Sequence, residues 1–373
     1  MRLDDFGNGA PATAALPNIR DFGMDTISLA GTLPAKLAAV RHAGFAQIML
    51  SARDIVGHAE GVDAAVDAVR TSGLRVTGFQ VLRDFEGLSG HLHDYKVDVA
   101  KTMLDMGHAL GAKVLLVCSS TSTHATGDHD ALARDLRKLA MLALPLGIKV
   151  AYEGLSWGRT INEFTTAWDI VSRAGTPNLG IGIDSYHILA TRTKLDDLDL
   201  IDPTKIFLVQ LADFMWQEVR TPEERMATAR HFRVFPGEGV HSETLADLVT
   251  RLDALGYRGD YSFEVFNDDY QQMPLSTVAA RARHSALWLG EDVLRRAVSM
   301  RSSLDRTSFH MKSASCTRKI LSGSSSPKSS SAVLVATAWN ESMPMPRFGA
   351  SARQTMSQAL VNSLTCRPHD KPS

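Results

Sequence analysis

The sequence has little of what marks secreted, membrane or zinc-finger proteins. Its 373 residues include only three cysteines, Cys118, Cys316 and Cys366, whose spacing fits neither a disulfide framework nor a zinc finger. No apolar run approaches the roughly 20 residues that a membrane span needs. The first residues also lack the basic and then apolar pattern of a signal peptide. We therefore expect a cytoplasmic protein with no membrane partner.

The sequence also lacks an excess of one charge. Its formal net charge is −1, and charged residues make up 22% of the chain. This balance argues against nucleic acid as the main partner. Hydrophobic residues make up 44%, which is enough for a full core in one large domain or two ordinary ones. The oligomeric state stays open, with a homo-oligomer among the alternatives.

The two ends of the chain differ from the rest. Residues 1–20 are rich in Gly, Ala and Pro without periodicity, which predicts a flexible arm. Residues 300–373 are Ser-rich and of low complexity, and from residue 301 they carry ten Lys or Arg against three Asp or Glu. Such a segment cannot bury enough apolar surface to fold, so we expect a disordered tail. The first 300 residues keep 30 basic and 38 acidic side chains, a net charge of −8, which leaves a functional role for the basic tail as the alternative.

Between these ends, over residues 21–299, short apolar runs alternate with helical patterns that stop at or beside glycine. The expected strands cover residues 25–30, 46–51, 75–82, 113–119, 148–153, 179–184, 206–213 and 260–266. The expected helices cover residues 33–42, 61–72, 94–110, 128–144, 162–174, 194–200, 242–255 and 275–297. Such alternation predicts the α/β class and a (β/α)₈ TIM barrel, typically of about 250 residues. An open doubly wound sheet would show a Gly-rich phosphate loop after its first strand, and residues 28–32 do not form one.

One stretch, residues 178–187, joins a buried strand to two reactive side chains. Glycine alternates with aliphatic residues, as in a parallel strand buried on both faces, and the run ends at Asp184 with His187 three residues later. A buried aspartate is costly. Either it caps the following helix, or it belongs to the site that a barrel builds after its strands. Taken alone, this stretch leaves both interpretations open.

Three other expected strands also end at an oxygen-bearing side chain: Glu153, Gln210 and Glu264. Together with Asp184 they would surround the mouth of the barrel. Carboxylates gathered at low dielectric repel one another, and a divalent cation removes that conflict. Ligands that are all oxygen favour Mg²⁺ or Mn²⁺, whereas zinc usually recruits His or Cys. The competing interpretation is four unrelated polar residues at strand ends.

Three further side chains are candidate substrate contacts. Arg83 follows the third expected strand, where a guanidinium can grip a carboxylate with two hydrogen bonds. His187 follows a candidate metal ligand and can serve as a general acid or base. Arg233 lies in the loop after the seventh expected strand, where a barrel builds its site. A surface salt bridge is the alternative for each of these side chains. It is also the interpretation that we favour for two neighbouring residues, Arg159 and His231.

These residues stand in motifs that resemble the xylose-isomerase-like superfamily. The motifs are Glu153-x3-Trp-Gly-Arg159, Asp184-Ser-Tyr-His187, Phe207-x2-Gln210-x2-Asp213, Arg230-His-Phe-Arg-x-Phe-Pro-Gly-x-Gly239 and Ser262-x-Glu264-x-Phe-Asn-Asp268. Within the superfamily they are similar to bacterial 3-dehydroshikimate dehydratases, over residues 20–297. The resemblance implies that Glu153, Asp184, Gln210 and Glu264 bind the metal and that Arg83, His187 and Arg233 line the substrate pocket.

The chemistry that the resemblance implies is the loss of water from 3-dehydroshikimate to give protocatechuate, as in quinate and shikimate degradation. One divalent ion (Mg²⁺, Mn²⁺ or Co²⁺) would polarise the ketone. His187 is then the expected proton shuttle, and Arg83 or Arg233 the expected carboxylate clamp. A sugar or sugar-phosphate isomerase or epimerase would use the same metal and the same proton abstraction. A binding barrel without catalysis is the remaining alternative.

Two features depart from this family pattern. The second expected strand and its end, residues 47–53, lack the glutamates that many relatives carry there, which bears on the substrate more than on the metal. In addition, the tail bears no likeness to the dioxygenase-like half that often follows the barrel in the dehydratases.

Overall fold

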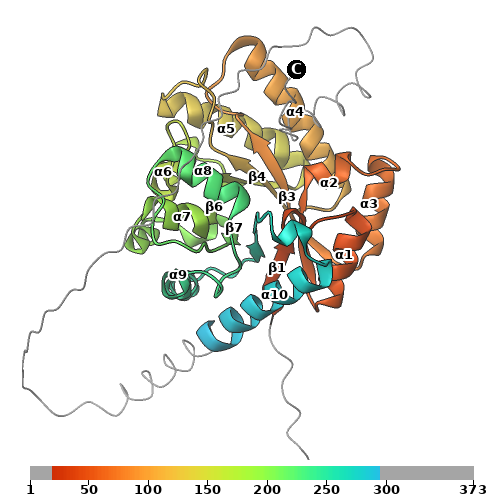
Figure 1. Cartoon of the computed structure of the whole chain (residues 1–373). Helices are drawn as coiled ribbons and strands as arrows, with labels where there is room; N and C mark the ends of the chain where they lie inside the picture. Colours follow the sequence, from red (N-terminus) through yellow and green to blue (C-terminus); the bar gives the residue numbers. More distant parts are fainter. Residues whose placement is uncertain (1–18, 295–373) are drawn as a thin grey trace, which may run out of the picture.

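The computed structural model describes residues 19–294. They form a closed barrel of eight parallel strands in chain order, with β8 paired to β1. Helices surround the barrel on the outside (Figure 1). The strands are β1 (Phe22–Asp25), β2 (Gln47–Ser51), β3 (Arg75–Arg83), β4 (Val114–Cys118), β5 (Lys149–Glu153), β6 (Leu179–Asp184), β7 (Ile206–Leu211) and β8 (Tyr261–Phe263). The predicted TIM barrel is confirmed, whereas the expected tail lies outside the described residues, as does all but the end of the expected arm.

Helices or 3-10 turns connect each strand to the next. The α-helices are α1 (Leu33–His42), α2 (Ala52–Val56), α3 (Val62–Thr71), α4 (Gly90–Ala109), α5 (His129–Ala143), α6 (Phe164–Ala174), α7 (Ser185–Thr191), α8 (Pro222–His231), α9 (Ser242–Leu255) and α10 (Leu275–Leu287). Gly175 and Gly256 end α6 and α9 in the left-handed conformation that glycine adopts without steric cost. Among residues 19–294, none of the helices combines the length and apolarity needed to cross a membrane.

The predicted first strand was wrong in its position. The strand occupies Phe22–Asp25, and a 3-10 turn, Thr26–Ser28, follows it where the prediction placed the strand. The Asp25 carboxylate accepts a hydrogen bond from Ile27 N at 2.9 Å and so caps that turn. Ser28 Oγ then bonds Phe263 O at 3.1 Å, which ties the turn to β8. Asp25 is therefore a fourth carboxylate at the end of a barrel strand.

Three short helices were missed by the sequence prediction. Helices α2 and α7 follow β2 and β6 directly, and each is too short for a helical period to show. Helix α8 lies in the long polar stretch after β7. Its start does carry a signal, because Thr221 and Glu224 form a capping box around Pro222.

The alternation of side chains along the strands decides which residues face the barrel interior. A small apolar cluster that includes Met49, Leu116, Ala151 and Leu208 lies apart from the main core between strands and helices. Side chains two positions further along each strand also face the barrel interior, and they lie nearer the carboxyl ends of the strands. In β6 the interior positions are glycines. A Cβ at Gly182 would lie 3.2 Å from Leu116 and 3.6 Å from the Glu153 Cβ, so glycine keeps space open beside Glu153.

Candidate metal centre and active site

The predicted ligand side chains come together at the carboxyl end of the barrel. Glu153, Asp184, Gln210 and Glu264 are all buried. Asp184 and Gln210 are directly paired in register between β6 and β7. Asp184 Oδ1 accepts from Tyr186 N at 2.8 Å, which caps α7, while Oδ2 faces the barrel mouth. The predicted helix cap is therefore confirmed, while the second oxygen of Asp184 remains turned toward the candidate site.

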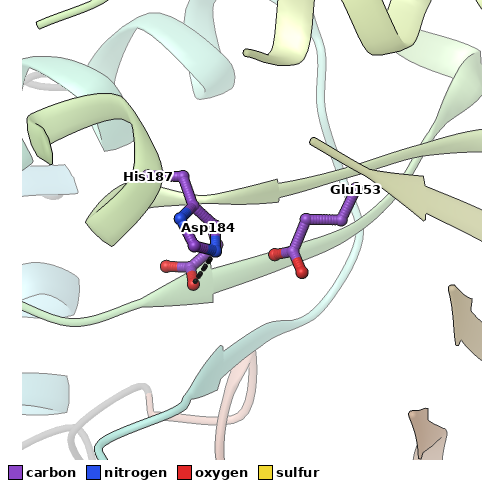
Figure 2. Close-up of side chains that lie close together, drawn as sticks. All are labelled: Glu153, Asp184 and His187. Atoms are coloured by element: carbon purple, nitrogen blue, oxygen red, sulfur yellow. Dashed lines mark ion pairs between the residues drawn. The ribbon is translucent and has the colours of Figure 1, made fainter. Parts of the chain in front are cut away.

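Glu153, Asp184 and His187 form the tightest group of potential ligands. One ligand atom from each lies within 4.8 Å of the other two, and all three side chains are buried. Figure 2 shows the Glu153 carboxylate and the His187 ring converging on Asp184 from β5 and α7. His187 Nε2 lies 3.6 Å from Asp184 Oδ2. The sequence placed His187 beside the candidate metal ligands, and the structure adds that one of its ring nitrogens lies within 4.8 Å of a carboxylate oxygen of Glu153 and of Asp184.

These residues suit a divalent cation by the chemistry of their unsatisfied atoms. Glu153 Oε1 is buried and has no hydrogen-bond partner among the described residues. Burial raises the pKa of Glu153 well above its usual range, and the neighbouring Asp184 and Glu264 raise it further. Burial likewise raises the pKa of Asp184 and of Glu264. A cation would offset this desolvation and repulsion and would use the orphaned carboxylate oxygen.

Arg233 contacts the candidate ligands themselves. Its guanidinium is buried and donates from Nη1 to Asp184 Oδ2 at 2.8 Å and to Glu264 Oε2 at 3.0 Å. The ring of Tyr186 packs 4.5 Å from the guanidinium, and that of Phe266 packs at 5.4 Å. Burial alone would lower the pKa of Arg233, but the two carboxylates outweigh it and raise the pKa overall. Arg233 therefore holds two ligand carboxylates in place as a permanent cation.

His187 is held by the loop after β5. Its Nδ1 accepts from the Ser156 backbone N–H at 3.1 Å and lies 3.0 Å from Ser156 Oγ. Burial lowers the pKa of His187 well below its usual value, and Arg233 lowers it further. Because a backbone N–H can only donate, the neutral ring carries its hydrogen on Nε2, facing Asp184. The Trp157 ring packs against the imidazole with centroids 5.2 Å apart.

Arg83 is the one predicted substrate contact that is exposed. It ends β3, and within residues 19–294 its guanidinium makes no hydrogen bond or ion pair. The positive charge of Arg83 still acts on the buried carboxylate of Glu264. Burial dominates the raised pKa of Glu264, while the positive charges of Arg233 and Arg83 act against it. Arg83 is thus free to meet a ligand, whereas Arg233 is already paired.

Two groups that the sequence did not single out also face this site. Asp25 is fully buried at the end of β1, and Gln80 Nε2 donates to its Oδ2. Burial raises the pKa of Asp25 well above its usual range, and Glu264 adds to the effect. Cys118 donates its thiol hydrogen to Glu153 Oε2 at 3.0 Å. The signal for Cys118 was its place at the end of β4, one strand from Glu153, but a single cysteine in an apolar run reads as core.

The match to known families accords with this geometry. The chain matches the family described as "Xylose isomerase-like TIM barrel" over residues 37–291. The chain belongs to this family. A 3-dehydroshikimate dehydratase from Pseudomonas aeruginosa is 38% identical over 267 residues, and one from Pseudomonas putida is 36% identical over 266 residues. Each alignment covers 71% of this chain and 41% of the relative, so the chain spans less than half the length of these two relatives.

Solved structures share the fold. A xylose isomerase-like TIM barrel/4-hydroxyphenylpyruvate dioxygenase fusion protein superposes with a TM-score of 0.70 and 34% identity, over 76% of this chain and 45% of that chain. The IOLI protein, solved with a bound zinc atom, superposes with a TM-score of 0.63 and 20% identity, over 74% of this chain and 99% of its own. An inosose isomerase from Halalkalibacterium halodurans is 30% identical over 155 residues, which is 41% of this chain and 51% of the relative.

Proposed function

We propose that the chain is a divalent-metal-dependent lyase that removes water from 3-dehydroshikimate to give protocatechuate. The observation that carries the proposal is the charge arrangement of the site. Glu153, Asp184 and Glu264 are buried beside one another with a single buried guanidinium to balance them, while Arg83 stands exposed. Such a site suits one divalent cation and one anionic substrate. The relatives named 3-dehydroshikimate dehydratase, at 36–38% identity, support the same activity.

The metal would be held by Glu153, Asp184, Gln210 and Glu264. When bound, a divalent cation supplies Lewis acidity that stabilises negative charge on a substrate ketone oxygen. Three carboxylates contribute three negative charges, which Arg233 and a divalent cation together neutralise. Mg²⁺, Mn²⁺ and Co²⁺ are the proposed ions. Cys118 and His187, which lie next to Glu153 and Asp184, add soft and nitrogen donors at the edge of the site, so Zn²⁺ belongs in the same comparison.

The substrate carboxylate would be bound by Arg83. A planar guanidinium can form two parallel hydrogen bonds to a carboxylate, which fixes the orientation of the ring as well as its position. Arg233 is the weaker candidate for this role, because it is buried and already bonded to Asp184 and Glu264. We therefore assign the clamp to Arg83 and the stabilisation of the ligand carboxylates to Arg233.

His187 is the proposed proton shuttle. A C–H proton next to the ketone moves to a base and leaves its electron pair as an enolate. The hydroxyl on the adjacent carbon then leaves with a proton as water, and the ring tautomerises to the aromatic acid. To accept a proton at Nε2, neutral His187 must move its hydrogen to Nδ1, where Ser156 Oγ at 3.0 Å can accept it. This shift gives up the hydrogen bond that the Ser156 backbone N–H donates to Nδ1 at 3.1 Å, so Ser156 favours the tautomer with hydrogen on Nε2 and offers only Oγ to the other tautomer.

The test is turnover by the purified chain. Incubation with 3-dehydroshikimate and Mn²⁺ should produce the absorbance of protocatechuate, and mass spectrometry should find a product lighter by one water. Absence of turnover with every metal named above would reject the proposal.

The second candidate function is an isomerase or epimerase acting on a sugar-like ketone. The similarity to inosose isomerases, at 30% identity over 155 residues, favours this reading, and the same proton abstraction would serve it. A neutral polyol needs no carboxylate clamp, however, so an exposed Arg83 speaks for the dehydratase. Parallel assays with an inosose would separate the two: turnover of the inosose alone would favour the isomerase.

A further inference from the structure

The loop that begins with Arg83 is hydrogen-bonded to the loop after β4 by two carboxylates, those of Asp84 and Glu86. The proposed reaction uses neither of them. Asp84 adopts a left-handed conformation (φ 50°), which is uncommon for residues other than Gly, Asn and Asp. Its Oδ1 accepts from Thr121 N at 2.8 Å and lies 3.2 Å from both Thr121 Oγ1 and Ser120 Oγ. One carboxylate oxygen therefore gathers three donors from the loop after β4.

Glu86 makes a second fastening, deeper in the protein. It is 1% exposed, and its Oε1 accepts from Ser120 N at 2.6 Å and from the Tyr152 hydroxyl at 3.0 Å. Tyr152 precedes the candidate ligand Glu153 on β5. Glu86 therefore links the Arg83 loop both to the loop after β4 and to the strand that carries a metal ligand.

Glu86 is a costly residue for a purely structural link. Its Oε2 is buried and has no hydrogen-bond partner among residues 19–294. Burial raises the pKa of Glu86 to about 7, and the stabilisation of the carboxylate by its own backbone N–H, by Ser120 and by Tyr152 only partly counters it. The titratable groups that face it are Asp84 in the same loop, Tyr152 on β5 and Lys96 on α4. A buried, half-satisfied carboxylate costs stability, so its presence beside a functional arginine calls for another reason.

We propose that Asp84 and Glu86 are positioning residues that hold Arg83 where it meets the substrate carboxylate. Lys96 completes the arrangement from the other side, since its Nζ donates to the Arg83 carbonyl oxygen at 2.7 Å. The backbone of Arg83 is thus fixed while its guanidinium stays free. This inference rests on the proposed function, because it takes Arg83 as the group that grips the substrate. Preorganisation of this kind lowers the entropy lost on binding.

The decisive variant is Glu86→Gln, which keeps an acceptor oxygen for Ser120 and Tyr152 but removes the charge. The KM for 3-dehydroshikimate should rise about tenfold, because charge-assisted hydrogen bonds become neutral ones. The fall in kcat should be smaller, and the Kd for Mn²⁺, measured by calorimetry, should not change. Asp84→Asn, which tolerates the left-handed backbone, should shift KM in the same direction.

The pH dependence of stability separates positioning from a structural role. The folded pKa of Glu86, about 7, lies above its reference value of 4.5. Between these values the folded protein keeps a proton that the unfolded chain has lost, so this group's contribution to stability falls as the pH rises from 4.5 past 7. Glu86→Gln removes that fall. Its Tm at pH 8 should equal or exceed the wild-type Tm, while its KM is worse.

The matched control is Glu238→Gln. Glu238 also accepts from a backbone N–H, that of Phe235 at 3.2 Å, and from a tyrosine hydroxyl, that of Tyr270 at 2.5 Å. It lies between α8 and α9, and it also pairs with Arg281 Nε at 2.8 Å. Its KM should stay within about twofold of the wild-type value, because the partners of Glu238 include neither the Arg83 loop nor the candidate ligands.

Amide hydrogen exchange of residues 83–87 tests the inference without any substrate. Exchange should quicken in Glu86→Gln and Asp84→Asn but not in Glu238→Gln. Unchanged exchange together with unchanged KM in both folded variants would overturn the inference, as would a Glu86→Gln variant that loses stability at pH 8 and keeps its KM. If the wild type fails to turn over 3-dehydroshikimate, the proposed function fails, and the exchange result alone then decides the positioning.

Discussion

The two sides of the barrel mouth are built on different principles. On the side of β5 to β8, the site residues Glu153, Asp184, Gln210 and Glu264 project from strand ends or the positions next to them and are buried. On the side of β3 and β4, the exposed Arg83 stands where β3 ends, and a loop held by side-chain hydrogen bonds follows it. Positions on strands allow little movement, which suits metal ligands. A residue at a loop can meet a mobile substrate while its backbone stays anchored.

Electrostatics separates the two sides in the same way. The strand side holds mutually repelling carboxylates whose pKa values burial raises, with Arg233 as their internal cation. The loop side presents Arg83, a cation whose side chain has no hydrogen-bond or ion-pair partner within residues 19–294. The strand side is therefore prepared for a cation and the loop side for an anion. The proposed dehydratase needs both, a metal at the ketone and a guanidinium at the carboxylate.

The largest effect should come from removing the metal. Exhaustive dialysis against EDTA is expected to abolish turnover, and Mg²⁺, Mn²⁺ or Co²⁺ should restore it. Saturating metal should also raise the Tm, since a ligand at 100 times its Kd stabilises the fold by about 2.7 kcal/mol. Full activity of the chelated protein would mean that the strand side does not work through a metal.

Replacement of His187 should come next. Loss of a proton shuttle costs about 10²–10⁴-fold in kcat with little change in KM. We expect His187→Ala to bind both metal and substrate in calorimetric titrations but to turn over slowly. Ser156→Ala is its companion, because it removes the Oγ that the second tautomer of His187 needs and keeps the backbone N–H. Normal kcat in His187→Ala would place the shuttle elsewhere.

Replacement of Arg83 tests the loop side directly. Arg83→Ala should raise the KM for 3-dehydroshikimate by about 10²-fold, as expected for the loss of a charge-assisted bidentate contact. Because Arg83 is exposed and unpaired within the described residues, the Tm should stay near the wild-type value. Arg83→Lys should recover only part of the affinity, since an ammonium cannot reproduce the two parallel hydrogen bonds. An unchanged KM in Arg83→Ala would remove the clamp from the loop side.

The same test on Arg233 should give the opposite result. Its guanidinium is buried between Asp184 and Glu264, so Arg233→Gln leaves two carboxylates uncompensated at a cost of about 3–5 kcal/mol. The Tm measured with EDTA should fall sharply, and added metal should recover part of it. Chemical denaturation of both arginine variants, with and without Mn²⁺, compares the two sides in one experiment. A stable Arg233→Gln with a high KM would instead assign Arg233 to the substrate.

The sequence was informative where one local rule controls the outcome. Alternating glycine and aliphatic residues before Asp184 predicted a buried β6, and the strand does end there. The end of β5 at Glu153 was also predicted, whereas β7 ends at Leu211, two residues before the end predicted for it. Asp25 was missed because the apolar run chosen for the first strand began at that residue, whereas the strand ends there. The short strand and the 3-10 turn after it both mix apolar with polar residues, so composition could not locate the boundary between them.

Long-range contacts account for what the sequence could not show. From its residue type and its place in a loop, Glu86 looks solvent-exposed. It is nevertheless buried, and its hydrogen-bond partners Ser120 and Tyr152 come from the loop after β4 and from β5. Arg233 was read as a substrate clamp from its place in a loop after a strand. Only its three-dimensional neighbours reveal the ion pairs with Asp184 and Glu264, which are 49 and 31 residues away along the chain. Residue type and spacing identify candidates, and the pairing decides their roles.

The smallest effect should come from truncation after residue 300. The strands of the closed barrel and all the residues assigned to chemistry lie within residues 19–294, so kcat and Tm should stay near their full-length values. Truncation after Leu287 is the matched control. It removes the π-helical segment Trp288–Leu294, including the fully buried Leu289, and should lower the Tm by about 5 °C or more. Thermal melts and steady-state kinetics of the three chains would decide. If truncation after residue 300 lowered the Tm as much as truncation after Leu287, the segment after residue 300 would contribute to the folded barrel. The expectation drawn from its Ser-rich composition would then be wrong.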